Sequence, residues 1–236
     1  MLAGGKRNLP EAYRVDRCIP LDLSRIATVP FSDADLGGAK KKENCWQFPL
    51  HDTVRGVPFG FVNPMLMDGR GMVMLRGGKN RPDLPREVKI PVGKRIKRLF
   101  FLHGLGWTKG NYFGANGDVS QHNPVLKYTI RFRNAPDTVL TMRDGVEIGG
   151  WKVAPGMKSL PEIPYALSGN VYPSAVSGQY GEGAGGYVYC WENKVVAAGV
   201  TNQDVEQRSL AEISEIRISS VGSGLPIVLA ITAEEE

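Results

Sequence analysis

The sequence predicts an all-β protein built as one antiparallel β-sandwich with little helix. Short runs of apolar or alternating residues recur along the chain, and none keeps a helical period for more than about three turns. Glycine and proline are frequent, with 29 and 16 residues among 236, which suits many short strands joined by turns. Roughly ten short strands with long loops between them are typical of an antiparallel sandwich.

The length fits one such domain. A chain of 236 residues can bury a substantial hydrophobic core without covalent staples. We therefore treat residues 1–236 as a single β-sandwich domain in which residues 1–18 are a lead-in segment. The three cysteines, Cys18, Cys45 and Cys190, are too few for a disulfide framework and lack the spacing of a zinc site. One disulfide with one free thiol and three buried thiols are both compatible with the sequence.

One long apolar stretch in the middle of the chain organises the other elements. Val88 to Val92 is a predicted strand, Gly93 and Lys94 allow a turn, and Ile96 to Leu102 is a predicted buried strand of large apolar residues. Residues 103–123 then form a predicted loop in which aromatic and polar side chains lie among glycines and asparagines. We expect this loop to carry a binding site, because rigid strands commonly present functional loops at the surface.

The other predicted strands are short. Those before the central stretch are residues 19–26, 57–62 and 71–75. Those after it are residues 125–132, 139–142, 148–154, 186–191, 195–199, 210–219 and 225–232. The alternation in residues 210–219 directs Glu212, Glu215 and Arg217 to solvent. Residues 28–46 and 155–185 have no apolar period and are predicted loops, and the final Ala-Glu-Glu-Glu is a predicted solvated tail.

Six motifs in order carry a resemblance to a known family. They are IPVGKRIKRLFFLHGLGW, YTIRF, TMRDGVEIGGW, GYVYCWEN, ISEIRISS and IVLAIT, and they span most of residues 48–232. In this order the chain resembles the galactose-binding-like jelly-roll modules found beside the catalytic domains of many polysaccharide-degrading enzymes. The resemblance implies a jelly-roll β-sandwich and a carbohydrate ligand.

Loop aromatic residues are the candidate ligand contacts. A flat ring stacks on the C–H face of a sugar while polar neighbours form hydrogen bonds with its hydroxyls. The alternative is that these rings fold back over the core, and Trp151 in particular lies beside a predicted strand. The candidate ligand-binding residues are His103, Trp107, Tyr112, Phe113, Gln121, His122, Trp151, Tyr172 and Tyr180.

The histidines allow a second function class. His103 and His122 bracket one loop, and with Tyr180 and a carboxylate they would supply the acid and base of a polysaccharide lyase or glycoside hydrolase. The simpler interpretation of His103 is a hydrogen-bonded structural residue at a strand end. No pair of carboxylates stands out, so the sequence favours a non-catalytic carbohydrate-binding module over an enzyme. The available carboxylates are Asp118, Asp144, Glu147, Glu162 and Glu182.

One structural calcium ion is the cofactor that the resemblance implies. Modules of this kind often hold calcium between an early loop and the last strand, and Asp33, Asp35 and Glu234 offer oxygen ligands at those places. The alternative for residues 32–38 is a loop closed by Asx turns.

The net charge of +5 favours an anionic polysaccharide as partner, and Lys40 to Lys42 is a dense basic run, although solvated turns also explain it. We predict a carbohydrate partner, no nucleic acid and no membrane, with attachment to a catalytic domain as an option. Residues 1–20 lack the apolar core of a signal peptide, and no segment has transmembrane length. The function class nevertheless predicts a secreted, cell-surface or periplasmic protein.

Overall fold

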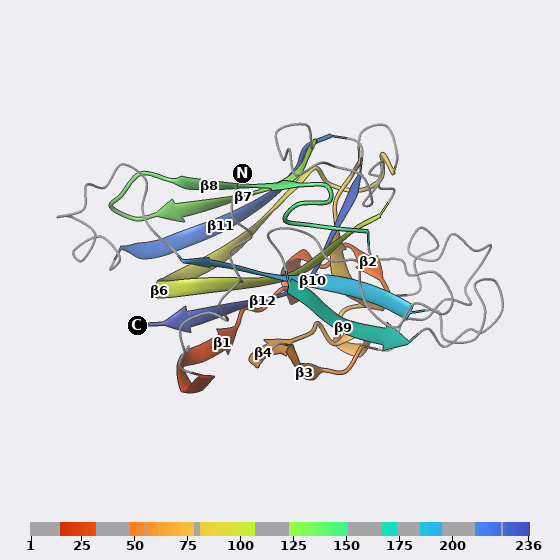
Figure 1. The fold of residues 1–236 in the computed structure, drawn as a ribbon, viewed down its shortest axis with the longest axis horizontal. Coiled ribbons are helices and arrows are strands. Elements are labelled where there is room, and N and C mark those ends of the chain that lie inside the picture. The colour runs from red at the N-terminus through yellow and green to blue at the C-terminus, as the bar shows by residue number, and fades with distance from the viewer. Residues whose placement is uncertain are drawn as a thin grey trace, which may run out of the picture.

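The computed structural model describes residues 15–31, 48–54, 56–77, 81–106, 123–150, 167–173, 185–194, 211–222 and 224–236, and for 167–173 and 185–194 it describes the backbone. The regular elements in these residues are antiparallel strands and three 3-10 helices, η1 (Val15–Arg17), η2 (Ser24–Ile26) and η3 (Pro64–Leu66). The predicted all-β, antiparallel fold class is confirmed (Figure 1).

The strands range in length from 2 to 20 residues. They are β1 (Cys18–Pro20), β2 (Val29–Pro30), β3 (His51–Val54), β4 (Val57–Gly60), β5 (Arg70–Met74), β6 (Glu87–Gly106), β7 (Pro124–Phe132), β8 (Thr138–Arg143), β9 (Leu167–Pro173), β10 (Gly185–Lys194), β11 (Glu212–Ser220) and β12 (Leu225–Glu235).

Strand β6 joins the two halves of the sheet. Its first part, Glu87 to Arg95, pairs with β11, which pairs with β7, and β7 with β8. Its second part, Ile96 to Gly106, pairs with β12, and Arg98 to His103 pair with β10 on the other edge. Strands β1 and β5 extend the sheet from β12, β2 from β5, and β9 from β10. The predicted role of this stretch as organiser is therefore confirmed.

The two halves fold over each other to give a β-sandwich-like architecture. Tyr128 of β7 pairs with Ile218 of β11, which pairs with Val88 in the first part of β6. The ring centroid of Tyr128 nevertheless lies 4.1 Å from that of Phe101, in the second part of β6. Because β7 and the second part of β6 are not paired in the sheet, this ring contact crosses between the two halves.

Two apolar clusters hold these layers together. One lies between the two halves and includes Ile130, Ile216 and Ile231. The other lies between the second half and the β3–β4 hairpin and includes Phe59 and Phe100. Strand β12 contributes to both clusters and is buried from Leu225 to Glu234. It therefore lies in the middle layer, with one apolar cluster on each of its faces. Full burial of a large apolar side chain contributes about 1.5–3 kcal/mol each, which favours this layered arrangement.

The turn predicted at Gly93 and Lys94 is wrong, because β6 continues through both residues. Gly93 has φ 65°, and the ladder places Val92 and Gly93 opposite Ser214 alone. This is a β-bulge, which bends a strand without ending it. The strand also continues past His103 to Gly106, so the loop begins later than predicted.

Other elements also differ from prediction: Val29–Pro30, in the predicted loop of residues 28–46, form β2, which pairs with β5. Residues 19–26 form β1 and η2, because the Asp22 carboxylate accepts a hydrogen bond from Ser24 N at 2.8 Å and starts a turn. Residues 167–173 form β9 rather than a loop, so Tyr172 stands in a strand, opposite Gly186. The predicted solvated tail is the end of β12.

Gly93 and Gly222 both have positive φ but differ in the space available for a side chain. Gly222 (φ 89°) approaches Pro124 so closely that an added Cβ would lie 2.7 Å from its carbonyl oxygen, whereas a Cβ on Gly93 would meet no atom within 4 Å. We expect Gly93→Ala to cost about 1 kcal/mol through its backbone conformation alone. Gly222→Ala should cost about 2–4 kcal/mol, because the contact with Pro124 must also open. Urea unfolding measures both, and equal costs would contradict the close approach.

Candidate functional site

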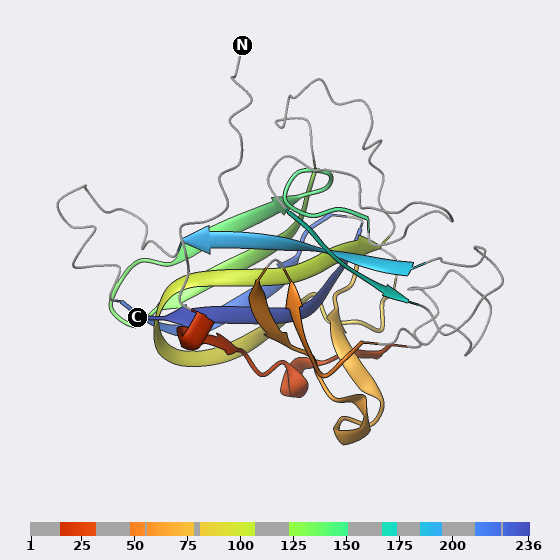
Figure 2. The ribbon, with the colours of Figure 1, turned by 60° about the horizontal axis from the view of Figure 1, so that its bottom comes forward.

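The described residues that flank the predicted binding loops meet at one end of the sandwich. Gly106 ends β6, and the Leu105 amide donates to Gly149 O at 2.8 Å, which brings residue 150 to the same place. Tyr189 pairs with His103, so the start of β10 at Gly185 runs on beyond it in the direction of Gly106. We call this region the loop end. It lies opposite the C-terminus (Figure 2).

Most predicted site residues lie outside the described residues. Of the proposed ligand contacts these are Trp107, Tyr112, Phe113, Gln121, His122, Trp151 and Tyr180. Of the proposed metal ligands and carboxylates they are Asp33, Asp35, Asp118, Glu162 and Glu182. The Lys40 to Lys42 run and Cys45 also lie outside. For Tyr172 and Cys190 the backbone alone is described, in β9 and β10.

His103 is a structural core residue. It is 0% exposed, and its ring nitrogens lie 2.9 Å from Tyr128 Oη and 3.0 Å from Glu147 O. A carbonyl only accepts, so Nε2–H donates to Glu147 O and Nδ1 accepts from the Tyr128 hydroxyl. Burial lowers the pKa of His103 to about 4, against a weaker opposing effect of the Glu147 hydrogen bond. The neutral ring is therefore the form that the fold holds, which agrees with the simpler interpretation above.

The two described candidate carboxylates belong to a tight turn beside His103. Both Asp144 and Glu147 are 7% exposed. The Glu147 carboxylate accepts hydrogen bonds from Arg143 N at 2.8 Å and from the Arg143 guanidinium. Gly145 N donates to Ile148 O and closes the turn. Glu147 thus fixes the turn that covers His103, and its backbone carbonyl rather than its carboxylate faces the imidazole.

Glu234, the proposed calcium ligand of the last strand, faces a buried cation. Its carboxylate lies 3.4 Å from Arg98 Nε, and both side chains are 2% exposed. Cys18 pairs with Glu234 on the neighbouring strand and is a free thiol. Burial and the Glu234 carboxylate raise the pKa of Cys18 to about 11, so it stays protonated at neutral pH. Within the described residues no three His, Cys, Asp or Glu side chains form a group suited to a metal ion.

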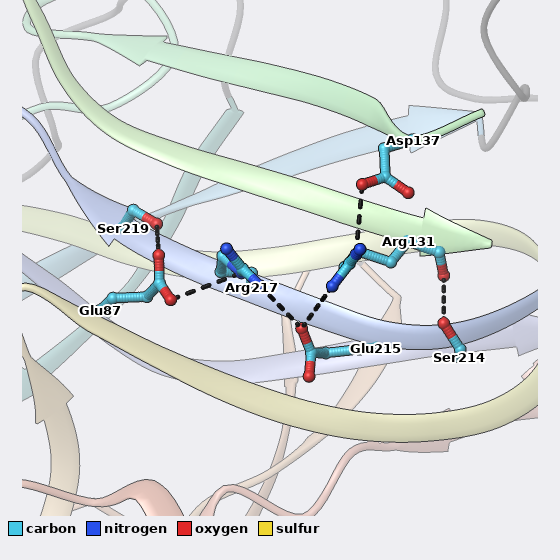
Figure 3. A network of polar contacts seen from close by, with 7 residues as sticks. All are labelled: Glu87, Arg131, Asp137, Ser214, Glu215, Arg217 and Ser219. Atoms are coloured by element: carbon cyan, nitrogen blue, oxygen red, sulfur yellow. Dashed lines mark hydrogen bonds and ion pairs between the residues drawn. The ribbon is translucent and has the colours of Figure 1, made fainter. Parts of the chain in front are cut away.

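The outer face of β6, β11 and β7 is a chain of alternating charges. Arg217 lies between Glu87 and Glu215, at 3.4 and 3.6 Å. Arg131 continues the chain from Glu215, at 4.0 Å, to Asp137, at 3.2 Å. Figure 3 shows these side chains in a row. Each of these two arginines has carboxylates on both sides, so the charges of Arg217 and Arg131 are balanced within the row.

A groove with apolar and basic side chains lies on the flank of the sandwich. It has a volume of about 520 Å³ and is open to solvent. One wall is the segment from η2 to β2, and the other contains the Arg81–Pro85 turn and the start of β6. Ile26, Val29, Leu84 and Val88 are apolar residues along it. Its volume lies within the range of about 300–1,000 Å³ that is typical of small-ligand sites.

Basic side chains surround this groove. Arg25, Arg70, Arg81 and Lys89 line it, with Asp83 as the one acidic residue among those lining it. Asp83 is bound by Arg81, whose Nη2 donates to Oδ2 at 2.9 Å, and this contact lowers the pKa of Asp83. These cations cannot be recognised as a group in the sequence, because they lie far apart in the chain and no basic run joins them.

The groove adjoins the loop end. Pro85 O accepts from Arg76 N at 2.9 Å, and Leu75 N donates to Pro226 O at 3.0 Å. Pro226 in turn pairs with Leu105 of β6. The Arg81–Pro85 wall is therefore linked to the strand that ends at Gly106 through these three successive contacts.

In comparisons with known proteins, no family model, no curated protein and no solved structure matches this chain. The part of the chain that the structure describes also holds no helix with the length and apolar character needed to span a membrane.

Proposed function

We propose that this chain is a non-catalytic carbohydrate-binding module with a galactose-binding-like jelly-roll fold, and that its loop end holds a polysaccharide or oligosaccharide. The observation that carries the proposal is the meeting of Gly106, Gly150 and the facing strand ends Pro173 and Gly185 at one end of the sandwich. These positions flank the predicted loops that contain Trp107 and Tyr180. Loops gathered at one end of a rigid sandwich are a common location for binding sites.

Binding is favoured over catalysis because His103, the proposed acid or base, is buried and has a hydrogen-bond partner at each ring nitrogen. A general base must come within hydrogen-bond distance of the substrate, directly or through one water. His103 is fully buried and engaged through both ring nitrogens, and the Glu147 carboxylate is engaged by Arg143. The alternative of a lyase or hydrolase that uses His103, His122 and Tyr180 therefore has less support. A structural calcium ion bound by Asp33, Asp35 and Glu234 stays a prediction, and Arg98 beside Glu234 weighs against it.

Truncation of loop aromatics tests the proposal. We expect Trp107→Ala and Tyr112→Ala each to weaken glycan binding by about 1–3 kcal/mol, because a stacking platform is lost. The melting temperature should stay unchanged. The measurement is isothermal titration with an oligosaccharide of the glycan that retains the wild-type protein best.

Val139→Ala is the control, since Val139 is an apolar residue of β8, 54% exposed and distant from the loop end. It should alter neither binding nor melting. If Trp107→Ala and Tyr112→Ala instead lose about 3–5 kcal/mol of stability and bind normally while folded, the rings belong to the core and the proposed site is wrong.

A further inference from the structure

We infer that the flank groove is a subsite for an acidic group of the bound sugar, either the carboxylate of a uronic acid or a sulfate ester. This inference rests on the carbohydrate-binding function proposed above and names the class of glycan. It places the acidic sugar against the segment from Arg25 to Pro30, the Arg81–Pro85 turn and Lys89.

The first support is the excess of positive charge. Four cations line the groove with a single carboxylate, and that carboxylate is held by Arg81. Arg70 donates to the carbonyl oxygens of Met67 and Ala27, at 3.3 and 3.4 Å, which position its guanidinium but do not neutralise it. Its ion pair with the exposed Asp68 is long, at 3.9 Å. On the outer face, by contrast, the carboxylates of Glu87, Glu215 and Asp137 pair with the arginines.

The second support is the conformation of Arg81. Its φ is 52°, a left-handed value that is uncommon for a residue with a side chain. The conformation is held by the hydrogen bonds between the Arg81 guanidinium and Asp83 and by Leu84 N, which donates to Arg81 O at 3.1 Å. Unfavourable backbone conformations of this kind concentrate at ligand sites, where the surrounding contacts maintain them. The turn thus presents an oriented cation at the groove.

The third support is the apolar floor, which distinguishes a sugar from other anions. Ile26, Leu84 and Val88 offer a surface for the C–H face of a sugar ring, and the basic rim offers partners for its acidic substituent. Single-stranded nucleic acids usually stack their bases on aromatic rings. None of the residues that the structure places along the groove is aromatic, so the groove lacks the stacking platform that nucleic-acid bases usually use.

A charge-matched pair of variants tests the subsite. The groove variant is Arg25→Gln with Lys89→Gln, and both side chains are exposed. The control is Arg95→Gln with Lys97→Gln, which removes one exposed arginine and one exposed lysine at the bend of β6. Affinity electrophoresis of each full-length protein is run in gels with dextran, dextran sulfate, polygalacturonate or a neutral plant glucan. Binding of a single-stranded oligonucleotide is measured in parallel.

We expect the wild-type protein to be retarded more by an acidic polymer than by its neutral counterpart. The groove variant should lose about tenfold in that affinity, the control less than twofold, and neither should change in a neutral gel. Equal losses in the two variants, or equal retardation by neutral and acidic glycans, would overturn the subsite and leave the carbohydrate function standing. Retardation by no polysaccharide at all, or by the oligonucleotide alone, would overturn both.

Discussion

Removal of either partner of the Arg98–Glu234 pair is expected to destabilise the protein by about 3–5 kcal/mol. The two side chains lie 3.4 Å apart and are 2% exposed, on the paired strands β6 and β12. Glu234→Gln leaves the Arg98 charge buried without its counter-ion, and Arg98→Met does the same to the carboxylate. Such a charge has no access to water, so most of the cost is the desolvation of the remaining partner.

The same strands supply a matched control for this prediction. Lys94 and Glu235 form an ion pair between β6 and β12, but their side chains are 46% and 36% exposed. Glu235→Gln should therefore cost less than about 1 kcal/mol in urea unfolding. The double variant Arg98→Met with Glu234→Leu should recover much of the single-variant loss, because no charge is left buried. A loss at Glu234 as small as that at Glu235 is the result that would refute the buried pair.

Acid should destabilise the protein by about 3 kcal/mol through His103. The pKa of His103 falls from an ordinary value of 6.5 to about 4 in the fold, mainly through burial. Between these two pH values the unfolded chain binds the proton and the folded chain does not. Stability from this group is therefore complete above about pH 6.5 and is lost progressively as the pH falls towards 4.

The substitution His103→Gln isolates this contribution. A glutamine amide can donate to Glu147 O and accept from Tyr128, but it does not titrate in this range. We expect the free energy of unfolding of His103→Gln to fall less steeply than that of the wild type between pH 6.5 and 4. His51→Gln makes the same change at an exposed histidine and is the control for the substitution itself. Coincident profiles for His103→Gln and the wild type would show that His103 is accessible to protons in the fold.

Alternating and apolar runs predicted the core strands well, because those strands have one face in the interior. Ile216 and Ile218 are buried and Arg217 is directed outward, as the alternation in β11 requires. The bulge at Gly93 was mistaken for a turn, since a glycine with positive φ serves in both. Local sequence cannot decide between them, because the difference lies in whether β11 pairs on both sides of the glycine.

The residues whose environments the sequence did not predict have partners that are distant in the chain. Glu234 is part of a polar terminal run, and its burial follows from Arg98 on the neighbouring strand. His103 looked like a loop residue because the glycines on either side of Leu105 suggested a strand end. The groove cations Arg25 and Lys89 are brought together by the folding of the sheet, and no single segment contains enough of them to be recognised.

The most direct test of the proposed function is one incubation of the full-length protein with a panel of neutral and acidic polysaccharides, in which retention and new reducing ends are both measured. A parallel absorbance reading detects the unsaturated ends that a lyase would leave. The account predicts retention on at least one polysaccharide, with no increase in reducing ends or absorbance over a protein-free control. Product formation at catalytic amounts of protein, or a failure to be retained on any polysaccharide of the panel, would contradict it.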